Sequence, residues 1–120
     1  MKLTDQEKTA YMANLVHISQ IDGVISPKET SLLEEFRNIH GLKKPLYNSA
    51  CKVAENPSFK LVYVGNFGVQ VNILSEMLYL AHIDGDFCEK ESKVLESFSD
   101  GIGLTKDQFL KMIKEAESSC

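Results

Sequence analysis

The chain has 120 residues, of which 43% are hydrophobic and 25% charged, and its net charge is −4. These proportions predict one folded globular domain over residues 1–120 and exclude a disordered chain. The acidic balance argues against nucleic-acid binding, which needs a basic surface, and no apolar run approaches the ~20 residues that direct membrane insertion requires.

A first helix is predicted after Thr4, because Thr4 and Glu7 have the spacing of a capping box. In this motif the residue before a helix and the third helical residue exchange hydrogen bonds. We expect the helix to end near residue 21 and to bury one side, which carries Tyr11. Gly23 is expected to end it, because glycine readily adopts the left-handed conformation that follows many helices.

A second helix is predicted to start at Pro27, a residue favoured at the first helical position. Ser26 and Glu29 again have the spacing of a capping box, and Gly41 is placed to stop this helix. A third helix is predicted over about 45–55.

The join over residues 58–68 is rich in β-branched and aromatic residues, but a lone strand would have no partner. We therefore expect a helical turn there. A fourth helix over about 69–83 is apolar on most sides, which predicts a central position. A fifth helix is predicted over about 89–99, and Thr105 with Gln108 caps a sixth.

An internal repeat is the strongest feature of the sequence. Residues 17–29 match residues 79–91 at an offset of 62 (79 minus 17), and the match defines two copies at about 4–56 and 66–118. Neither copy could bury its apolar face alone. The sequence therefore predicts an all-α, single-domain bundle of about six to seven helices, built from two pseudo-symmetric helix-loop-helix halves.

Each copy contains the pattern Asp-Gly-x-φ-x-x-x-Glu, where φ is apolar, which is the spacing of the last eight positions of an EF-hand calcium loop. Hard divalent cations are bound by several oxygens, so these loops contain candidate ligands for calcium or magnesium. The candidate metal ligands are Asp22, Glu29, Asp84, Asp86 and Glu91.

Two observations weaken the metal interpretation. Where an EF-hand has its first two acidic ligands, the first loop has Ile18 and Gln20, so any binding is expected to be weak. The capping box also accounts for Glu29 without a metal, although Cys88 stands where the first loop has Ser26. Residues 63–120 have a net charge of −5 against +1 for residues 1–62, so a cation or a basic partner is expected at the second loop.

The cysteines and histidines form no recognisable catalytic arrangement. Cys51, Cys88 and Cys120 are scattered, and none is paired with a histidine at a spacing typical of a nucleophile and its base. The cysteines also form no disulfide framework, and the charged first residues do not match a signal peptide. We therefore expect a cytoplasmic protein without enzymatic activity.

The two Asp-Gly segments, residues 21–29 and 81–91, resemble the paired "ADG-x-φ-x-x-x-E" segments of the TerB-like family, with Ile21 and Ile83 in place of the usual alanine. That family is named for bacterial tellurite-resistance proteins, and a related domain occurs in a membrane-anchored DnaJ-type co-chaperone. The resemblance covers nearly the whole chain. It implies an all-helical domain whose acidic loop positions bind a metal or engage partners.

The sequence therefore predicts a non-enzymatic bacterial stress-response module that binds a divalent metal ion weakly, docks a protein partner, or does both. The partner is expected in a membrane-associated complex, with the chain itself a monomer or weak homodimer. The alternative is a purely structural protein-interaction domain, in which the acidic loops only cap helices.

Overall fold

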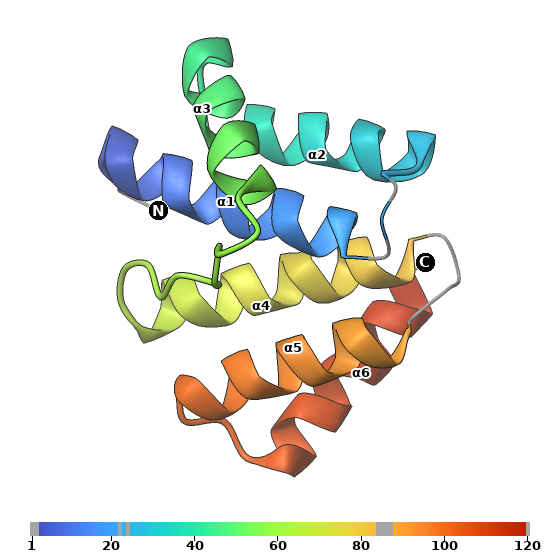
Figure 1. Ribbon diagram of the computed structural model, residues 1–120. Coiled ribbons are helices and arrows are strands. Elements are labelled where there is room, and N and C mark those ends of the chain that lie inside the picture. The colour runs from blue at the N-terminus through green and yellow to red at the C-terminus, as the bar shows by residue number, and fades with distance from the viewer. Residues whose placement is uncertain (1–2, 22, 24, 84–87, 120) are drawn as a thin grey trace.

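The structure, a computed structural model, describes residues 3–21, 23, 25–83 and 88–119. These residues form α-helices and no strand, which confirms the all-α prediction (Figure 1). In chain order the six helices are α1 (Asp5–Gln20), α2 (Pro27–Ile39), α3 (Lys44–Glu55), α4 (Phe67–His82), α5 (Glu89–Gly101) and α6 (Lys106–Ser119).

Capping boxes start the helices where the sequence predicts them. The Thr4 N–H donates to Glu7 Oε1 at 3.0 Å, and the Glu7 N–H donates to Thr4 Oγ1 at 3.1 Å. Before α6, Thr105 and Gln108 exchange the same two bonds at 2.8 and 3.2 Å. Each box satisfies backbone donors that have no partner inside the helix.

Glycines in the left-handed conformation end the helices that the sequence marks. Gly23 has φ +99° and Gly41 has φ +65°. At the end of α2 the Leu42 N–H donates to the Arg37 carbonyl at 2.9 Å. Gly103 has φ +90° after α5. A side chain at these φ values would be strained, which explains the glycines.

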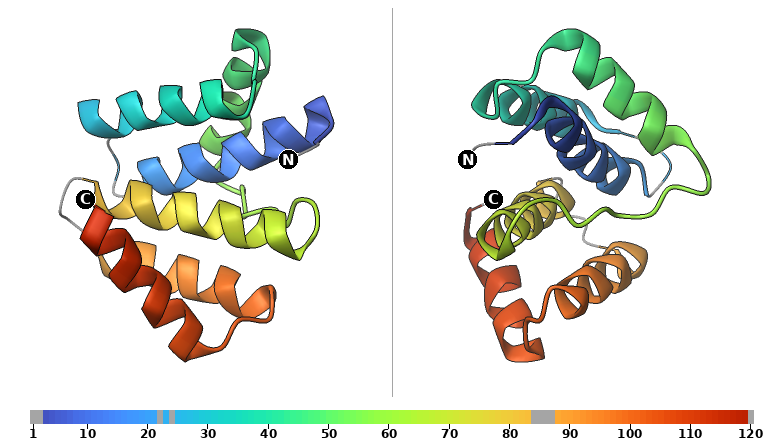
Figure 2. Two further views of the ribbon diagram at one scale, coloured as in Figure 1. Left: turned by 180° about the vertical axis from the view of Figure 1, so that it is seen from behind. Right: turned by 90° about the vertical axis from the view of Figure 1, so that its left-hand side faces the viewer.

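Helices α1 and α4 pack against each other in the middle of the molecule (Figures 1 and 2). Helices α2 and α3 pack on α1, whereas α5 and α6 pack on α4. The starts of α4, α5 and α6 each follow those of α1, α2 and α3 by 62 residues. The Cα radius of gyration, 13.2 Å, is that of a single compact domain of this length.

The core is built mainly from the two central helices. Burial on most sides of α4 confirms its predicted central position, with Ile73, Leu74, Met77 and Leu78 all 0% exposed. The predicted side of α1 is buried, with Tyr11 only 2% exposed, and burial extends around the helix to all of residues 11–16. Three neighbouring helices surround α1, so it has little free face.

No helix in the described part of the chain combines the length and apolar content needed to cross a bilayer.

The segment between α3 and α4 differs from its prediction. Residues 59–64 form neither the expected helical turn nor a strand. The fully buried Asn14 of α1 holds this segment, since its Nδ2 donates to the Val62 carbonyl at 2.8 Å. The Val62 N–H donates back to Asn14 Oδ1, also at 2.8 Å. The Asn14 carboxamide thus bonds to both backbone groups of Val62, as a neighbouring strand would.

Candidate functional site

Glu29, a predicted metal ligand, caps α2. Its Oε1 accepts the Ser26 N–H at 3.0 Å, and its own N–H donates to Ser26 Oγ at 3.1 Å. The residue is 4% exposed, so little of its carboxylate faces solvent. A carboxylate at a helix N-terminus is also stabilised by the helix dipole. These contacts match the capping interpretation of this position.

Glu91 has the equivalent place at the start of α5 and is also 4% exposed. Its Oε1 accepts the Cys88 N–H at 3.2 Å, and the Cys88 thiol completes the capping box. The hydrogen bond to the Glu91 side chain raises the pKa of the Cys88 thiol. Cys88 therefore occupies the N-cap position of α5, as Ser26 does for α2.

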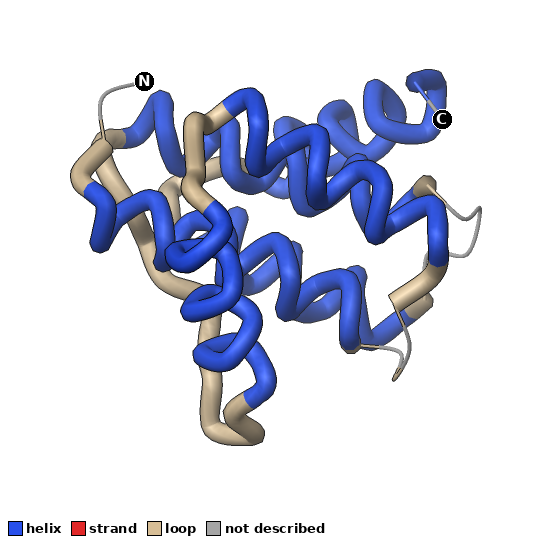
Figure 3. The backbone as a smooth tube through the Cα atoms, turned by 90° about the horizontal axis from the view of Figure 1, so that it is seen from above, coloured by secondary structure: helices blue, strands red, loops and turns tan. Residues whose placement is uncertain are grey.

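Asp22, Asp84 and Asp86, the other predicted ligands, lie outside the described residues. Within the described ranges, no three His, Cys, Asp or Glu side chains gather as a group that could hold a metal ion. The helix ends on either side of both loops lie at one end of the molecule (Figures 1 and 3). The helix ends that flank the two loops therefore share one end of the molecule, as the repeat predicts.

His82, at the end of α4, borders the second loop and is 6% exposed. Its Nδ1 lies 2.7 Å from the Leu78 carbonyl, so Nδ1 carries a proton and donates it. Its Nε2 lies 3.8 Å from Oε1 of Glu117, a residue of α6. The side chain thus lies between the base of the second loop and the last helix.

A partly buried polar cluster joins the two halves of the chain and was not predicted from the sequence. Glu76 of α4 accepts from the Tyr11 hydroxyl at 2.8 Å, and its two carboxylate oxygens lie 2.9 and 3.0 Å from His40 Nε2. Asn72 Nδ2 donates to the Tyr11 hydroxyl oxygen at 2.7 Å. The one available signal was that Glu76 is the only Asp, Glu, Lys or Arg residue of the mostly apolar α4.

This cluster borders two cavities, of about 310 and 320 Å³, and Asn72 and Glu76 line both. Burial, followed by the charge of Glu76, raises the pKa of the Tyr11 hydroxyl. Tyr11 consequently keeps its proton as a hydrogen-bond donor. Glu76 bonds to Tyr11 and His40 together, which fits a structural link between α1, the end of α2 and α4.

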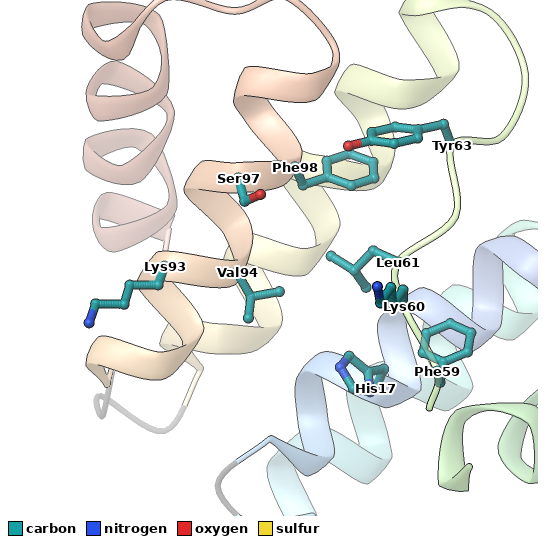
Figure 4. A pocket seen from close by; sticks show the side chains of 9 residues that line it. All are labelled: His17, Phe59, Lys60, Leu61, Tyr63, Lys93, Val94, Ser97 and Phe98. Carbon is teal, nitrogen blue, oxygen red and sulfur yellow. The ribbon is translucent and has the colours of Figure 1, made fainter. Parts of the chain in front are cut away.

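A larger cavity of about 520 Å³ opens between α1, the segment after α3, and α5; we call it the α1–α5 groove. Leu61 and Val94 point toward each other across it (Figure 4). Tyr63 stacks on Phe98 at one end, with ring centroids 4.9 Å apart. At the other end the ring of His17 lies 5.1 Å from that of Phe59. Burial lowers the pKa of His17, which favours its neutral form.

Comparisons of the chain with protein-family models, with curated proteins and with solved structures find no match. The TerB-like resemblance therefore stays a prediction from the two Asp-Gly segments, and the functional interpretation depends on the described contacts.

Proposed function

We propose that the chain is a non-enzymatic bacterial stress-related module of the TerB-like type that docks a protein partner. The docking surface is the end of the bundle that carries both Asp-Gly loops. One observation carries the proposal: Glu29 and Glu91 both cap helices, and the helices that they cap start at the same end of the molecule. Capping hydrogen bonds thus hold the helix starts that follow the two loops.

The common offset of 62 residues between equivalent helices supports two pseudo-symmetric halves. Two acidic loops, one from each half, then lie at one end, and residues 63–120 contribute a net charge of −5. A surface of this charge favours a partner with a basic face, because complementary charge speeds encounter and selects the partner. The partner is expected in a membrane-associated complex, as the family resemblance implies.

The chemistry of Cys51 and Tyr11 supports the absence of catalysis. Burial raises the pKa of the Cys51 thiol, so it stays protonated and is a poor nucleophile. Tyr11 is likewise held protonated beside Glu76. A covalent catalyst needs the opposite arrangement, in which neighbouring groups lower the pKa of the nucleophile.

Weak binding of calcium or magnesium is the second candidate function, and the acidity of the second loop favours it. One oxygen each of Glu29 and Glu91 already accepts a backbone N–H. The remaining predicted ligands, Asp22, Asp84 and Asp86, supply three oxygens if each binds through one, whereas a calcium site has six to eight. Such a site would bind weakly and would complete its coordination with water.

The docking proposal is tested by neutralising the second loop. A double variant, Asp84→Asn with Asp86→Asn, should lose a protein that the wild-type chain captures from a bacterial lysate, at unchanged stability. The matched control neutralises two exposed acids elsewhere, Asp100→Asn with Asp107→Asn, and should keep the partner. Equal capture by both variants would show that the loop is not the docking surface.

The cation candidate is tested separately, by titrating calcium, magnesium and zinc while recording amide shifts by NMR. Shifts confined to the two loops, and absent from the Asp84→Asn, Asp86→Asn variant, support binding there. If no amide shifts, helix capping by Glu29 and Glu91 explains the motif without a metal.

A further inference from the structure

The α1–α5 groove lies apart from the loop end and has the size and composition of a binding site. Its volume, about 520 Å³, lies within the range of pockets that hold compact ligands or short peptide segments. Apolar and aromatic side chains form most of its lining, including Leu61, Val94 and Phe98 (Figure 4). Half of the Tyr63 side chain remains exposed beside the buried Phe98, so the apolar lining continues to the surface.

The charge of the groove is opposite to that of the whole molecule. Among the described residues that line it are two lysines, Lys60 and Lys93, and no Asp or Glu. Lys93 is on the outer side of α5 and pairs with Glu89 at 3.3 Å, but both side chains are more than three-quarters exposed. Such a surface pair contributes little and exchanges readily. In a chain of net charge −4, the lining of this groove is thus positively charged, which favours an anionic group.

The backbone along one wall of the groove offers further hydrogen bonds. Asn14 satisfies both backbone groups of Val62. In the described part of the chain, the N–H and C=O groups of Leu61 and Tyr63 have no hydrogen-bond partner. A segment with unpaired backbone groups beside an apolar groove can pair with an extended peptide, while the groove takes alternate side chains.

We infer that the α1–α5 groove binds an extended segment of a partner protein in which acidic residues stand next to large apolar ones. The apolar side chains of that segment fill the space between Leu61 and Val94. Its carboxylates lie near Lys60, and its backbone pairs with Leu61 and Tyr63. This surface is independent of the Asp-Gly loops, so the chain would present two different docking surfaces.

The probe is a displayed library of short random peptides, selected against the full wild-type chain. The expected consensus combines Asp or Glu with Phe, Leu, Ile or Val. A synthetic consensus peptide is then titrated by fluorescence anisotropy, and NMR maps its contacts. Amide shifts should centre on Leu61, Tyr63 and Val94, and the amides of Leu61 and Tyr63 should gain protection from hydrogen exchange.

Charge reversal at the groove provides the matched comparison. Lys60→Glu should weaken binding of the consensus peptide at least about tenfold, because a like charge then faces its carboxylates. Lys111→Glu makes the same change at an exposed residue of α6 outside the groove lining and should alter binding by less than about twofold. Both lysines are exposed, so neither variant threatens the fold.

Four results would overturn the inference. They are no enriched peptide, a consensus without acidic residues, equal binding by the Lys60→Glu and Lys111→Glu variants, and amide shifts outside the groove. Dodecanoate serves as a control ligand. If it shifts the groove amides while no peptide does, the groove holds a small amphipathic anion and the partner inference fails.

Discussion

Replacing Asn14 by alanine should release the segment that forms one wall of the α1–α5 groove. Asn14 is 0% exposed, and its carboxamide makes two hydrogen bonds of 2.8 Å with the backbone of Val62. Each bond contributes about 1 kcal/mol net, and more is lost where a freed group stays buried. Val62 is 40% exposed, so water can reach its N–H and C=O groups once Asn14 is removed. The loss of free energy of unfolding should therefore stay near the sum for the two hydrogen bonds.

We therefore expect Asn14→Ala to lower the free energy of unfolding by about 2 kcal/mol. For a chain of this length, that corresponds to a fall in melting temperature of about 8 °C. The assay is urea unfolding combined with hydrogen exchange at the Val62 amide, which should lose its protection. Asn38→Ala, at an exposed position in α2, is the control and should be neutral or slightly stabilising.

A loss below about 0.5 kcal/mol, close to the range of ordinary surface substitutions, would contradict this account. Unchanged protection of the Val62 amide would do so as well. Either result would mean that apolar packing, and not the Asn14 carboxamide, positions this segment.

Three further predictions concern a cap, a histidine and a close contact. Glu29→Gln should leave stability nearly unchanged, because glutamine also closes a capping box, whereas Glu29→Ala should cost about 0.5–1 kcal/mol in urea unfolding. Burial lowers the folded-state pKa of His17, so the unfolded state binds more protons between that value and its own pKa of about 6.5. The contribution of the neutral, buried His17 side chain to stability is therefore present above pH ~6.5 and is lost as the pH falls through the folded pKa. A His17→Gln variant should consequently lose less stability than wild type between pH ~7 and ~5. A Cβ at Gly101 would overlap the Tyr63 hydroxyl, so Gly101→Ala should cost about 1 kcal/mol alone but become stabilising in a Tyr63→Ala background, where only the helix preference of alanine remains. A double-mutant cycle measures this reversal of sign, and equal effects in both backgrounds would contradict the contact.

Local chemistry explains why so much of the fold could be predicted from the sequence. A capping box such as Ser26 with Glu29 involves residues three apart, and a left-handed glycine such as Gly41 depends on its own backbone. These signals mark where helices begin and end before any tertiary contact forms. The apolar pattern of α4 was strong enough to predict its central position as well.

The candidate loop site could be predicted only as a pair of alternatives. The same spacing in the sequence suits a capping glutamate and a metal ligand, since both place a carboxylate three residues into a helix. The structure shows Glu29 and Glu91 bonded to the N-cap backbone, which decides their local role. Asp22, Asp84 and Asp86 lie outside the described residues, so their metal role stays a prediction.

Contacts between residues far apart in the chain were decided by the tertiary structure alone. Tyr11 and Glu76 are 65 residues apart, and Asn14 and Val62 are 48 apart. No local pattern indicates such a pair, because nothing in the sequence around one residue of a pair identifies the other. By itself, the sequence determined the helices, their ends and the repeat through short-range hydrogen bonding and apolar periodicity. Only packing decided that α1 is central and that Asn14 holds the segment along the α1–α5 groove, because burial is a property of the assembled helices.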